Sequence, residues 1–505
     1  MTRVLELNHI TKRFGALTAN DDVTLHLNRG EILSLLGENG AGKTTLMNIL
    51  FGHYIADAGR VRVNGDTLPP GQPRAAIAAG VGMVHQHFTL AGNMSVLDNI
   101  LIGSEKLTRL RSNRAGAIRE IAAISDQFGL PVAPLARVAD LSVGERQRVE
   151  IVKALYRRAR ILVLDEPTAV LARPEAERLF QTLRGMTAGG LSIIFISHKL
   201  HEVMATSDRV VVMRGGQVVA EKVTSETDQG ELAELMVGRR VARPLRQPHP
   251  AGPVVLHATD LHVIEGGQTR LDALNFTVRS GEILGIVGVS GNGQATLGRV
   301  LSGMVRPTSG MLTIDGTDMT RMTPRQLVQA GLARIPDDRH AEGVIAELPV
   351  WENAVSERLQ QPAFARFGFV RRRAARDFAK NLITQFDIRG AGPDTRTGLL
   401  SGGNMQKLIL GRNLVGQPRF ILANQPTRGL DEGAIAAVHT ALLAARARGA
   451  GIMLITEDLE EAIGLSDRIC AIVKGQLSAP VSPKLADART LGLMMAGVWG
   501  ADHAA

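Results

Sequence analysis

Residues 37–44 read Gly37-Glu38-Asn39-Gly40-Ala41-Gly42-Lys43-Thr44, a stretch of the form G-x-x-x-x-G-K-[ST]. An apolar run at residues 31–36 precedes it as a predicted buried strand, and a helix is predicted from about residue 43 to residue 50. Glycines allow backbone N–H groups to approach phosphate oxygens, and the helix adds the positive end of its dipole. We therefore predict that the loop binds ATP, with Lys43 on the β- and γ-phosphates and the Thr44 hydroxyl on Mg²⁺.

A second, altered copy of this motif lies 251 residues later. Residues 288–295 read GVSGNGQA, so Gly288 and Gly293 are kept while Gln294 and Ala295 replace the lysine and the hydroxyl. The same offset carries Gln86 onto Asp337. Later motif pairs, LSVGE (141–145) with LSGGN (400–404) and ILVLDEPT (161–168) with FILANQPT (420–427), are 259 residues apart. A constant offset with one eight-residue step indicates a duplication, with an insertion between residues 337 and 400.

The two halves are predicted to be separate domains of one α/β fold class. Short apolar runs at 31–36, 161–164, 191–196 and 210–213 recur in the second half at 282–287, 420–422, 452–455 and 469–473. They predict a mostly parallel sheet covered by helices in each half, with antiparallel edge strands. Residues 90–140 and 340–400 are more helical, which indicates an inserted helical subdomain. We expect a first P-loop nucleotide-binding domain at 1–238, a linker at 239–253 and a second such domain at 254–500, because four prolines in 239–253 exclude a helix or a central strand there.

Bulk composition excludes several classes of protein. The single cysteine, Cys470, excludes an internal disulfide framework and a cysteine-based zinc site. No apolar run reaches the ~18–20 residues that span a bilayer, and the N-terminus lacks a signal-peptide core, so a cytosolic location is expected. The net charge of +9 is compatible with nucleic acid or an anionic membrane, but its short, scattered basic clusters favour a solvated surface.

Four residues of the first half are candidates for the hydrolysis chemistry. Asp165 ends an apolar strand, where its carboxylate is suited to hold Mg²⁺ through bound water. Glu166 follows and is placed to orient or deprotonate the attacking water; the alternative is a simple turn at Asp165-Glu166-Pro167. Gln86, expected at a strand end, is a candidate for contacting Mg²⁺ or that water, and His198 for contacting the γ-phosphate.

An aromatic side chain is a candidate for the adenine base. Phe14 lies 23 residues before Gly37, in a loop between two strand-like segments, where a ring is able to stack on adenine. Core packing is the alternative. The equivalent position of the second half is Glu265, which cannot stack. The first-half residues predicted to bind ATP are Phe14, Gly37, Glu38, Asn39, Gly40, Ala41, Gly42, Lys43, Thr44 and Thr45.

Along the chain come the phosphate loop, Gln86, the LSVGE or LSGGN signature motif, the DEPT strand end and His198. This order resembles that of ABC ATPase cassettes, and the resemblance covers nearly the whole chain. The tandem arrangement is similar to the ATP-binding subunits of bacterial simple-sugar and nucleoside importers, with GMVHQHF (82–88) and LSGGNMQK (400–407) most similar to the nucleoside branch. In that family two cassettes close head to tail, so each ATP lies between one phosphate loop and the opposite signature motif. The resemblance implies that the first-half residues face Ser401, Gly402 and Gly403 within the same chain.

The opposite site is expected to be degenerate. It would combine Gly288, Gly293, Gln294, Ala295, Asn424, Gln425 and Glu457 with Ser142 and Gly144. It lacks the lysine, the magnesium ligands, the candidate base and the histidine, so we expect it to hydrolyse ATP very slowly or not at all. Whether it still binds nucleotide stays open at this stage.

The resemblance implies an ATPase that drives import of a nucleoside or simple sugar. Its expected partners are two membrane permease subunits and an extracytoplasmic solute-binding protein. Nucleic acid is not an expected partner. The expected location is the cytoplasmic face of the bacterial plasma membrane. The alternative is a soluble tandem cassette protein acting on ribosomes or nucleic acid. Such proteins generally keep two competent sites and a long charged linker, which this chain lacks. A small-molecule kinase would not explain the two signature motifs.

Overall fold

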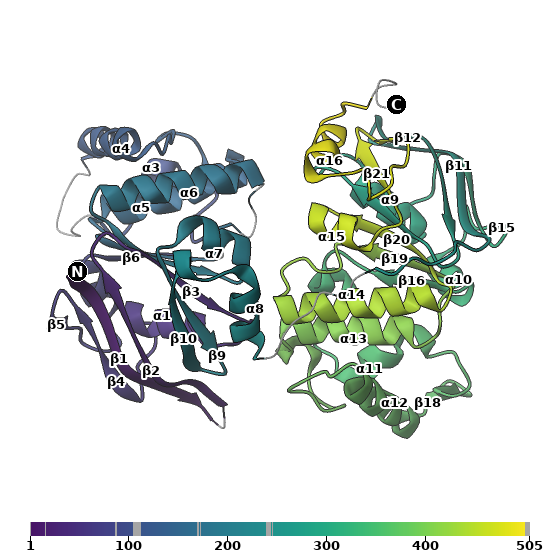
Figure 1. The fold of residues 1–505 in the computed structure, drawn as a ribbon, viewed down its shortest axis with the longest axis horizontal. Coiled ribbons are helices and arrows are strands. Elements are labelled where there is room, and N and C mark those ends of the chain that lie inside the picture. Colours follow the sequence, from purple (N-terminus) through teal and green to yellow (C-terminus); the bar gives the residue numbers. More distant parts are fainter. Residues whose placement is uncertain are drawn as a thin grey trace. The chain divides into compact units, whose positions relative to one another are not determined.

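A computed structural model describes residues 2–15, 17–85, 88–104, 113–168, 171, 173–238, 244 and 246–499. The chain divides into two compact units, Met1–Val241 and Ala242–Ala505, each described here by itself (Figure 1). Among the described residues, no helix has both the length and the apolar character needed to cross a bilayer.

The first unit is built on a six-stranded sheet. Five of its strands, β9, β3, β8, β7 and β6, run parallel to one another. The sixth, β10, pairs with β9 as an antiparallel edge strand. In sheet order the strands are β10 (Gln217–Val223), β9 (Arg209–Arg214), β3 (Ile32–Gly37), β8 (Ser192–Ser197), β7 (Ile161–Asp165) and β6 (Val81–Val84). Every residue of β3, β7 and β8 is buried, which explains their continuous apolar sequences.

A second, antiparallel sheet of the first unit faces the phosphate-loop helix. Its strands, in sheet order, are β2 (Leu17–Asn28), β1 (Arg3–Phe14), β4 (Ala58–Val63) and β5 (Asp66–Thr67). Helix α1 (Lys43–Phe51) shares one core with both sheets, because Leu46 and Met47 cluster with Leu5 of β1 and Leu35 of β3. The helix that follows the phosphate loop is thus held on two sides.

The remaining helices of the first unit include the predicted helical region. Helix α5 begins at a capping box, in which Ser142 accepts a hydrogen bond from Glu145 N (3.3 Å) and Glu145 accepts one from Ser142 N (2.8 Å). The helices are α2 (Pro73–Ala78), α3 (Val96–Leu101), α4 (Arg114–Phe128), α5 (Val143–Tyr156), α6 (Arg173–Ala188), α7 (Leu200–Thr206) and α8 (Gln229–Val237). Helices α3, α4, α5 and α6 contribute to one apolar cluster with the sheet.

The second unit repeats this architecture. Its large sheet consists of β16 (Leu332–Ile335), β19 (Phe420–Asn424), β20 (Gly451–Thr456), β13 (Ile283–Val287), β21 (Arg468–Val473) and β22 (Gln476–Leu477), with β22 antiparallel. The antiparallel sheet consists of β12 (Gln268–Arg279), β11 (Val254–Glu265), β14 (Ser309–Ile314) and β15 (Thr317–Asp318). The helices are α9 (Gln294–Leu301), α10 (Pro324–Gln329), α11 (Val350–Val355), α12 (Arg372–Gln385), α13 (Gly402–Leu414), α14 (Glu432–Ala447), α15 (Leu459–Leu465) and α16 (Ala488–Met495). The predicted fold class, two mostly parallel sheets each with an inserted helical region, is confirmed.

The eight-residue step in the repeat divides into at least two parts. The Asn99 side chain accepts a hydrogen bond from Ala91 N (2.7 Å), and the Asn353 side chain accepts one from Ile345 N (2.8 Å), so these asparagines are equivalent although 254 residues apart. Part of the insertion therefore precedes Asn353, where a π-helical turn spans Arg339–Gly343. The rest follows it, in a region that contains a small hairpin of β17 (Ala365–Arg366) and β18 (Phe369–Val370) within the segment expected to be helical.

Candidate active site

The phosphate loop joins β3 to α1 and needs its glycines for steric reasons. A Cβ on Gly37 would lie 2.4 Å from Met213 O, and one on Gly42 would lie 2.3 Å from Ala19 O. Gly40 and Gly42 have φ values of 86° and 97°, in the left-handed region that favours glycine. No described side chain caps the N-terminus of α1. Its first N–H groups therefore face the loop, as an anion-binding site requires.

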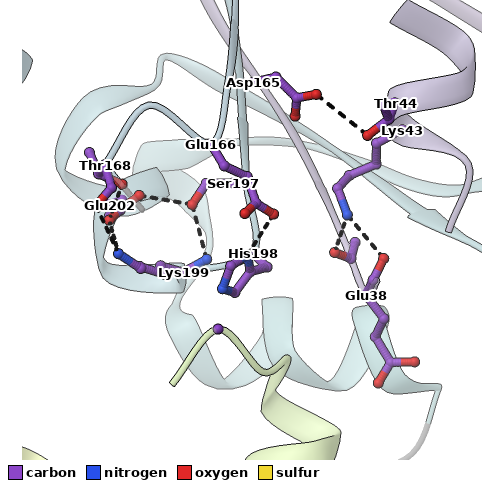
Figure 2. A network of polar contacts seen from close by, with 12 residues as sticks. Glu38, Lys43, Thr44, Asp165, Glu166, Thr168, Ser197, His198, Lys199 and Glu202 are labelled. Carbon is purple, nitrogen blue, oxygen red and sulfur yellow. Dashed lines mark hydrogen bonds and ion pairs between the residues drawn. The ribbon is translucent and has the colours of Figure 1, made fainter. Parts of the chain in front are cut away.

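Lys43 bends back over this loop. Its Nζ donates to Gly37 O (2.7 Å) and Glu38 O (3.0 Å), and the residue is only 6% exposed (Figure 2). The ammonium group is thus already held beside the loop backbone, where an incoming phosphate would meet it. This placement agrees with the phosphate contact predicted for Lys43.

Thr44 and Asp165 bring two oxygen donors together from segments 121 residues apart. Thr44 Oγ1 donates to Asp165 Oδ2 across 3.5 Å, with Asp165 at the end of β7 (Figure 2). Burial, reinforced by the neighbouring Glu166 and opposed by Lys43, raises the pKa of Asp165 to about 6. A buried carboxylate beside a hydroxyl is a donor set that suits Mg²⁺.

Glu166 and His198 form the most direct side-chain contact of the site. His198 Nδ1 lies 2.8 Å from Glu166 Oε1, with side chains 8% and 14% exposed (Figure 2). Burial by itself would raise the pKa of Glu166, but the hydrogen bond from His198 and the charges of His198, Lys43 and Lys199 hold it below its usual value. The lowered pKa favours the ionised carboxylate, the state that a general base requires.

The backbone at Glu166 is in an unusual conformation that aims this side chain. Glu166 has φ = 46°, and its N–H donates to Ile196 O (3.0 Å) at the end of β8. Gln425, the equivalent residue of the second unit, has φ = 47° and donates to Ile455 O (2.8 Å). This backbone conformation is the same in both units, while the carboxylate is present in one.

A buried polar network behind the site was not found from the sequence. Glu202 accepts hydrogen bonds from Thr168 Oγ1 (2.6 Å) and Ser197 Oγ (2.9 Å), and Lys199 Nζ pairs with it at 3.1 Å (Figure 2). This network ties the segment after β7 to the end of β8 and to α7, on either side of Glu166 and His198. Four ordinary polar residues spread over 35 positions carry no local pattern that would reveal it.

The predicted adenine contact, Phe14, lies at the end of β1 and is 43% exposed, so it is not a core residue. Its ring lies edge-to-face with that of Tyr54, 5.5 Å between centroids, and Lys12 Nζ is 5.4 Å from its centroid. Asp57 anchors the last residues of β1, next to the turn of the β1–β2 hairpin, by pairing with Lys12 (3.0 Å) and accepting from Arg13 N (2.7 Å). Tyr54, which the sequence analysis missed, is a second exposed aromatic at this position.

The remaining predicted residues are Gln86 and the signature motif of the second unit. Gln86 lies outside the described residues. In the second unit Ser401 caps α13 by accepting from Asn404 N (3.4 Å), so Gly402 and Gly403 form the first turn of that helix. Ser401 thus presents a helix N-terminus, the feature expected of a signature motif.

The second unit keeps the shape of its phosphate loop and loses its charges. Gly291 and Gly293 have φ values of 91° and 118°, matching the first loop. Gln294 takes the place of the lysine and donates from Nε2 to Val289 O (2.9 Å). Ala295 and Asn424 stand where the first unit has the Thr44 hydroxyl and the Asp165 carboxylate.

Acidic groups also face this second loop. Asp337, equivalent to Gln86, pairs with Arg428 at 3.0 Å. Glu457 stands where the first unit has His198, and its N–H donates to Gln425 Oε1 (3.5 Å). Burial, opposed by Arg428 and reinforced by Asp337, raises the pKa of Glu457 above its usual value. These groups are poorly suited to a triphosphate.

Comparison with known proteins agrees with this duplicated architecture. The sequence profile of the ABC transporter family matches residues 20–169 and again residues 271–428. The chain is similar to the nucleoside import ATP-binding protein NupA of Lactococcus lactis subsp. cremoris, with 40% identity over 98% of each chain. It is also similar to the glucose import ATP-binding protein TsgD13 of Haloferax volcanii, with 41% identity over 98% of this chain and 96% of the relative.

A solved structure aligns with both units. It is the archaeal ribosome recycling factor aABCE1, in complex with the ribosomal stalk protein aP1, with a TM-score of 0.62 over 94% of this chain and 90% of that one. The identity is 19%, so this likeness shows the fold alone.

Proposed function

The chain belongs to the ABC transporter family, and on that basis we propose that it hydrolyses ATP at one site to drive import of a nucleoside or a simple sugar. As a member it is an ATPase. The observation that carries the one-site proposal is the Glu166–His198 pair at 2.8 Å, beside Lys43 in the first unit, against Gln425 and Glu457 in the second.

The contacts of the first-unit residues support the following proposed roles. Lys43 and the loop N–H groups bind the phosphates, and Phe14 stacks on adenine. Thr44 and Asp165 would hold Mg²⁺, which would neutralise phosphate charge. Glu166 orients the attacking water and accepts its proton as the water oxygen bonds to the γ-phosphorus and the bond to the leaving phosphate oxygen breaks. His198 keeps Glu166 ionised and fixed in orientation.

The second unit contributes its signature motif rather than its own phosphate loop. In this proposal Ser401, Gly402 and Gly403 complete the first site when the halves pair head to tail, because a helix N-terminus stabilises the negative charge of the γ-phosphate. Supporting it is the retained cap at Ser401, beside a phosphate loop that has lost its lysine and its magnesium donors.

The proposed partners are two membrane permease subunits and a solute-binding protein, with this chain on the cytoplasmic face of the plasma membrane. Relatives named for nucleoside import and for glucose import are equally similar to this chain, so the solute class includes both. The ribosome or nucleic-acid alternative has little support, because the likeness to the recycling factor extends to the fold alone.

The test is ATP-dependent uptake in proteoliposomes that contain the chain and its genomically adjacent permease. Labelled nucleosides and sugars are offered separately with their binding protein. We expect uptake of one class, and we expect Lys43→Ala to abolish both uptake and ATP hydrolysis. The matched variant Gln294→Ala should retain hydrolysis. Absence of uptake of either class, together with binding of the chain to ribosomes, would reject the import function; equal loss in both variants would reject the single site.

A further inference from the structure

The second unit carries a short hairpin that the nucleotide chemistry leaves unused. β17 and β18 pair antiparallel, and Arg366 lies opposite Phe369, so Phe367 and Gly368 form a two-residue turn. The base of the hairpin is firmly held. Phe364 is buried against Phe378 with 5.2 Å between ring centroids, and Arg371 N donates to Phe364 O (2.8 Å).

The tip of this hairpin exposes two aromatic rings. Phe367 is 86% exposed and Phe369 is 79% exposed, and neither belongs to the hydrophobic core of the unit. Phe367 also has φ = 50°, and Gly368 has φ = 81°. Turns of this kind favour asparagine, aspartate or glycine at both positions, so a bulky residue there is strained. Phe367 therefore occupies the turn despite backbone strain and a large exposed apolar surface.

The hairpin is surrounded by positive charge. Arg366, Arg371, Arg372 and Arg373 are all exposed, and residues 359–376 contain no acidic side chain. Arg371 donates to Pro362 O (3.3 Å), and none of the four forms an ion pair among the described residues. The Arg366 guanidinium lies 5.1 Å from the centroid of Phe367.

Two of these arginines also lie at an electrostatically unfavourable end of a helix. Arg372 and Arg373 open the 14-residue helix α12, which has no acidic residue in its first turn. Cations at a helix N-terminus oppose the helix dipole, and the arrangement becomes favourable when an external anion binds there. Exposed rings, strain and unpaired charge all point to a ligand that is both anionic and apolar.

We propose that this hairpin, residues 364–373, inserts its tip into the headgroup region of a membrane that contains anionic phospholipids. Phe367 and Phe369 enter the interface between headgroups and acyl chains, and the arginines bind lipid phosphates. A bilayer surface matches a protruding tip, and its negative charge is complementary to the four unpaired arginines. The inference rests on the proposed function for the nearness of the membrane, and it adds a direct lipid contact to attachment through a permease.

The test is co-sedimentation of the full chain with vesicles, without any permease. Vesicles of phosphatidylcholine alone are compared with vesicles containing phosphatidylglycerol. We expect preferential binding to the anionic vesicles. Arg366→Gln with Arg373→Gln should weaken the partition coefficient about 30-fold at low salt, about fivefold for each charge. Phe367→Ser with Phe369→Ser should weaken it by roughly tenfold per ring, also at high salt.

Matched controls separate the hairpin from general surface properties. Leu485→Ser removes an apolar side chain that is 83% exposed, and Arg306→Gln with Arg321→Gln removes two exposed charges from the same unit. Both should bind vesicles like the wild type. ATP hydrolysis should be unchanged in the hairpin variants, which shows that they are folded and keeps this test separate from that of the import function.

Three outcomes overturn the proposal. The first is equal binding of the wild type to both vesicle types, and the second is undiminished binding of the hairpin variants. The third is loss of permease association with lipid binding intact, which would make the hairpin a protein contact instead.

Discussion

Phe14→Ala should weaken ATP binding without slowing the chemical step. The ring lies at the exposed end of β1, where its aromatic and cation–π contacts among the described residues are with Tyr54 and Lys12, away from the hydrolysis chemistry. Stacking of a base on an aromatic ring contributes about 1–3 kcal/mol, which corresponds to roughly 5- to 150-fold in affinity. Because Tyr54 remains beside the site in the variant, we expect the lower part of this range, about tenfold in KM for ATP.

The assay is steady-state phosphate release as a function of ATP concentration. KM should rise about tenfold while kcat stays within twofold, and Phe14→Tyr should restore KM, since a tyrosine ring stacks as well. Leu17→Ala is the control, because Leu17 lies opposite Phe14 in the same hairpin and is 66% exposed. An unchanged KM in Phe14→Ala would refute the stacking role. An equal rise of KM in Leu17→Ala would show that the change comes from disturbing the β1–β2 hairpin and not from lost stacking.

The remaining predictions concern magnesium, the signature motif and the buried network. Thr44→Ala should lower ATP hydrolysis at least tenfold and raise the Mg²⁺ concentration needed for half-maximal rate; a normal Mg²⁺ titration would exclude Thr44 as a ligand. Ser401→Ala should slow turnover about tenfold although it lies in the other half, whereas Ser142→Ala should not, and equal rates in the two variants would contradict head-to-tail pairing. Glu461 is the equivalent of Glu202 in the second unit, where it accepts from Thr427 Oγ1 (2.8 Å). Glu202→Gln should lower the free energy of unfolding by about 2 kcal/mol, and Glu461→Gln by less, because Glu202 has partners on both oxygens while Glu461 Oε2 has none in the described structure. Urea denaturation of the two variants tests that order.

The sequence predicted the sheets well because parallel strands are buried on both faces. The run expected at residues 161–164 is β7 (Ile161–Asp165), and the one expected at 452–455 is β20 (Gly451–Thr456). Their continuous apolar composition makes such strands visible without any tertiary information. The phosphate loop was equally predictable, since positive φ values of the local backbone require glycine at Gly40 and Gly42.

Features that depend on distant contacts were not predictable in the same way. The Thr168–Glu202 hydrogen bond joins residues 34 positions apart, and neither residue type is unusual where it stands. The hairpin at residues 365–370 was missed because its turn is Phe-Gly rather than Asn-Gly, in a segment whose composition suggested helix. Tyr54 was missed because its relation to Phe14 arises only from the packing of the loop after α1 against the end of β1.

The central claim is that one of two similar units performs hydrolysis, and the matched pair Glu166→Gln and Gln425→Ala tests it most directly. The two residues share the same positive φ and the same backbone hydrogen bond, so the variants differ in chemistry rather than in position. The measurement is steady-state phosphate release from Mg²⁺–ATP, with ATP binding followed separately. Glu166→Gln should lose about 10²- to 10⁴-fold in rate while still binding ATP, and Gln425→Ala should keep the wild-type rate within twofold. Retention of more than a tenth of the rate in Glu166→Gln, or an equal loss in Gln425→Ala, would contradict the single-site account.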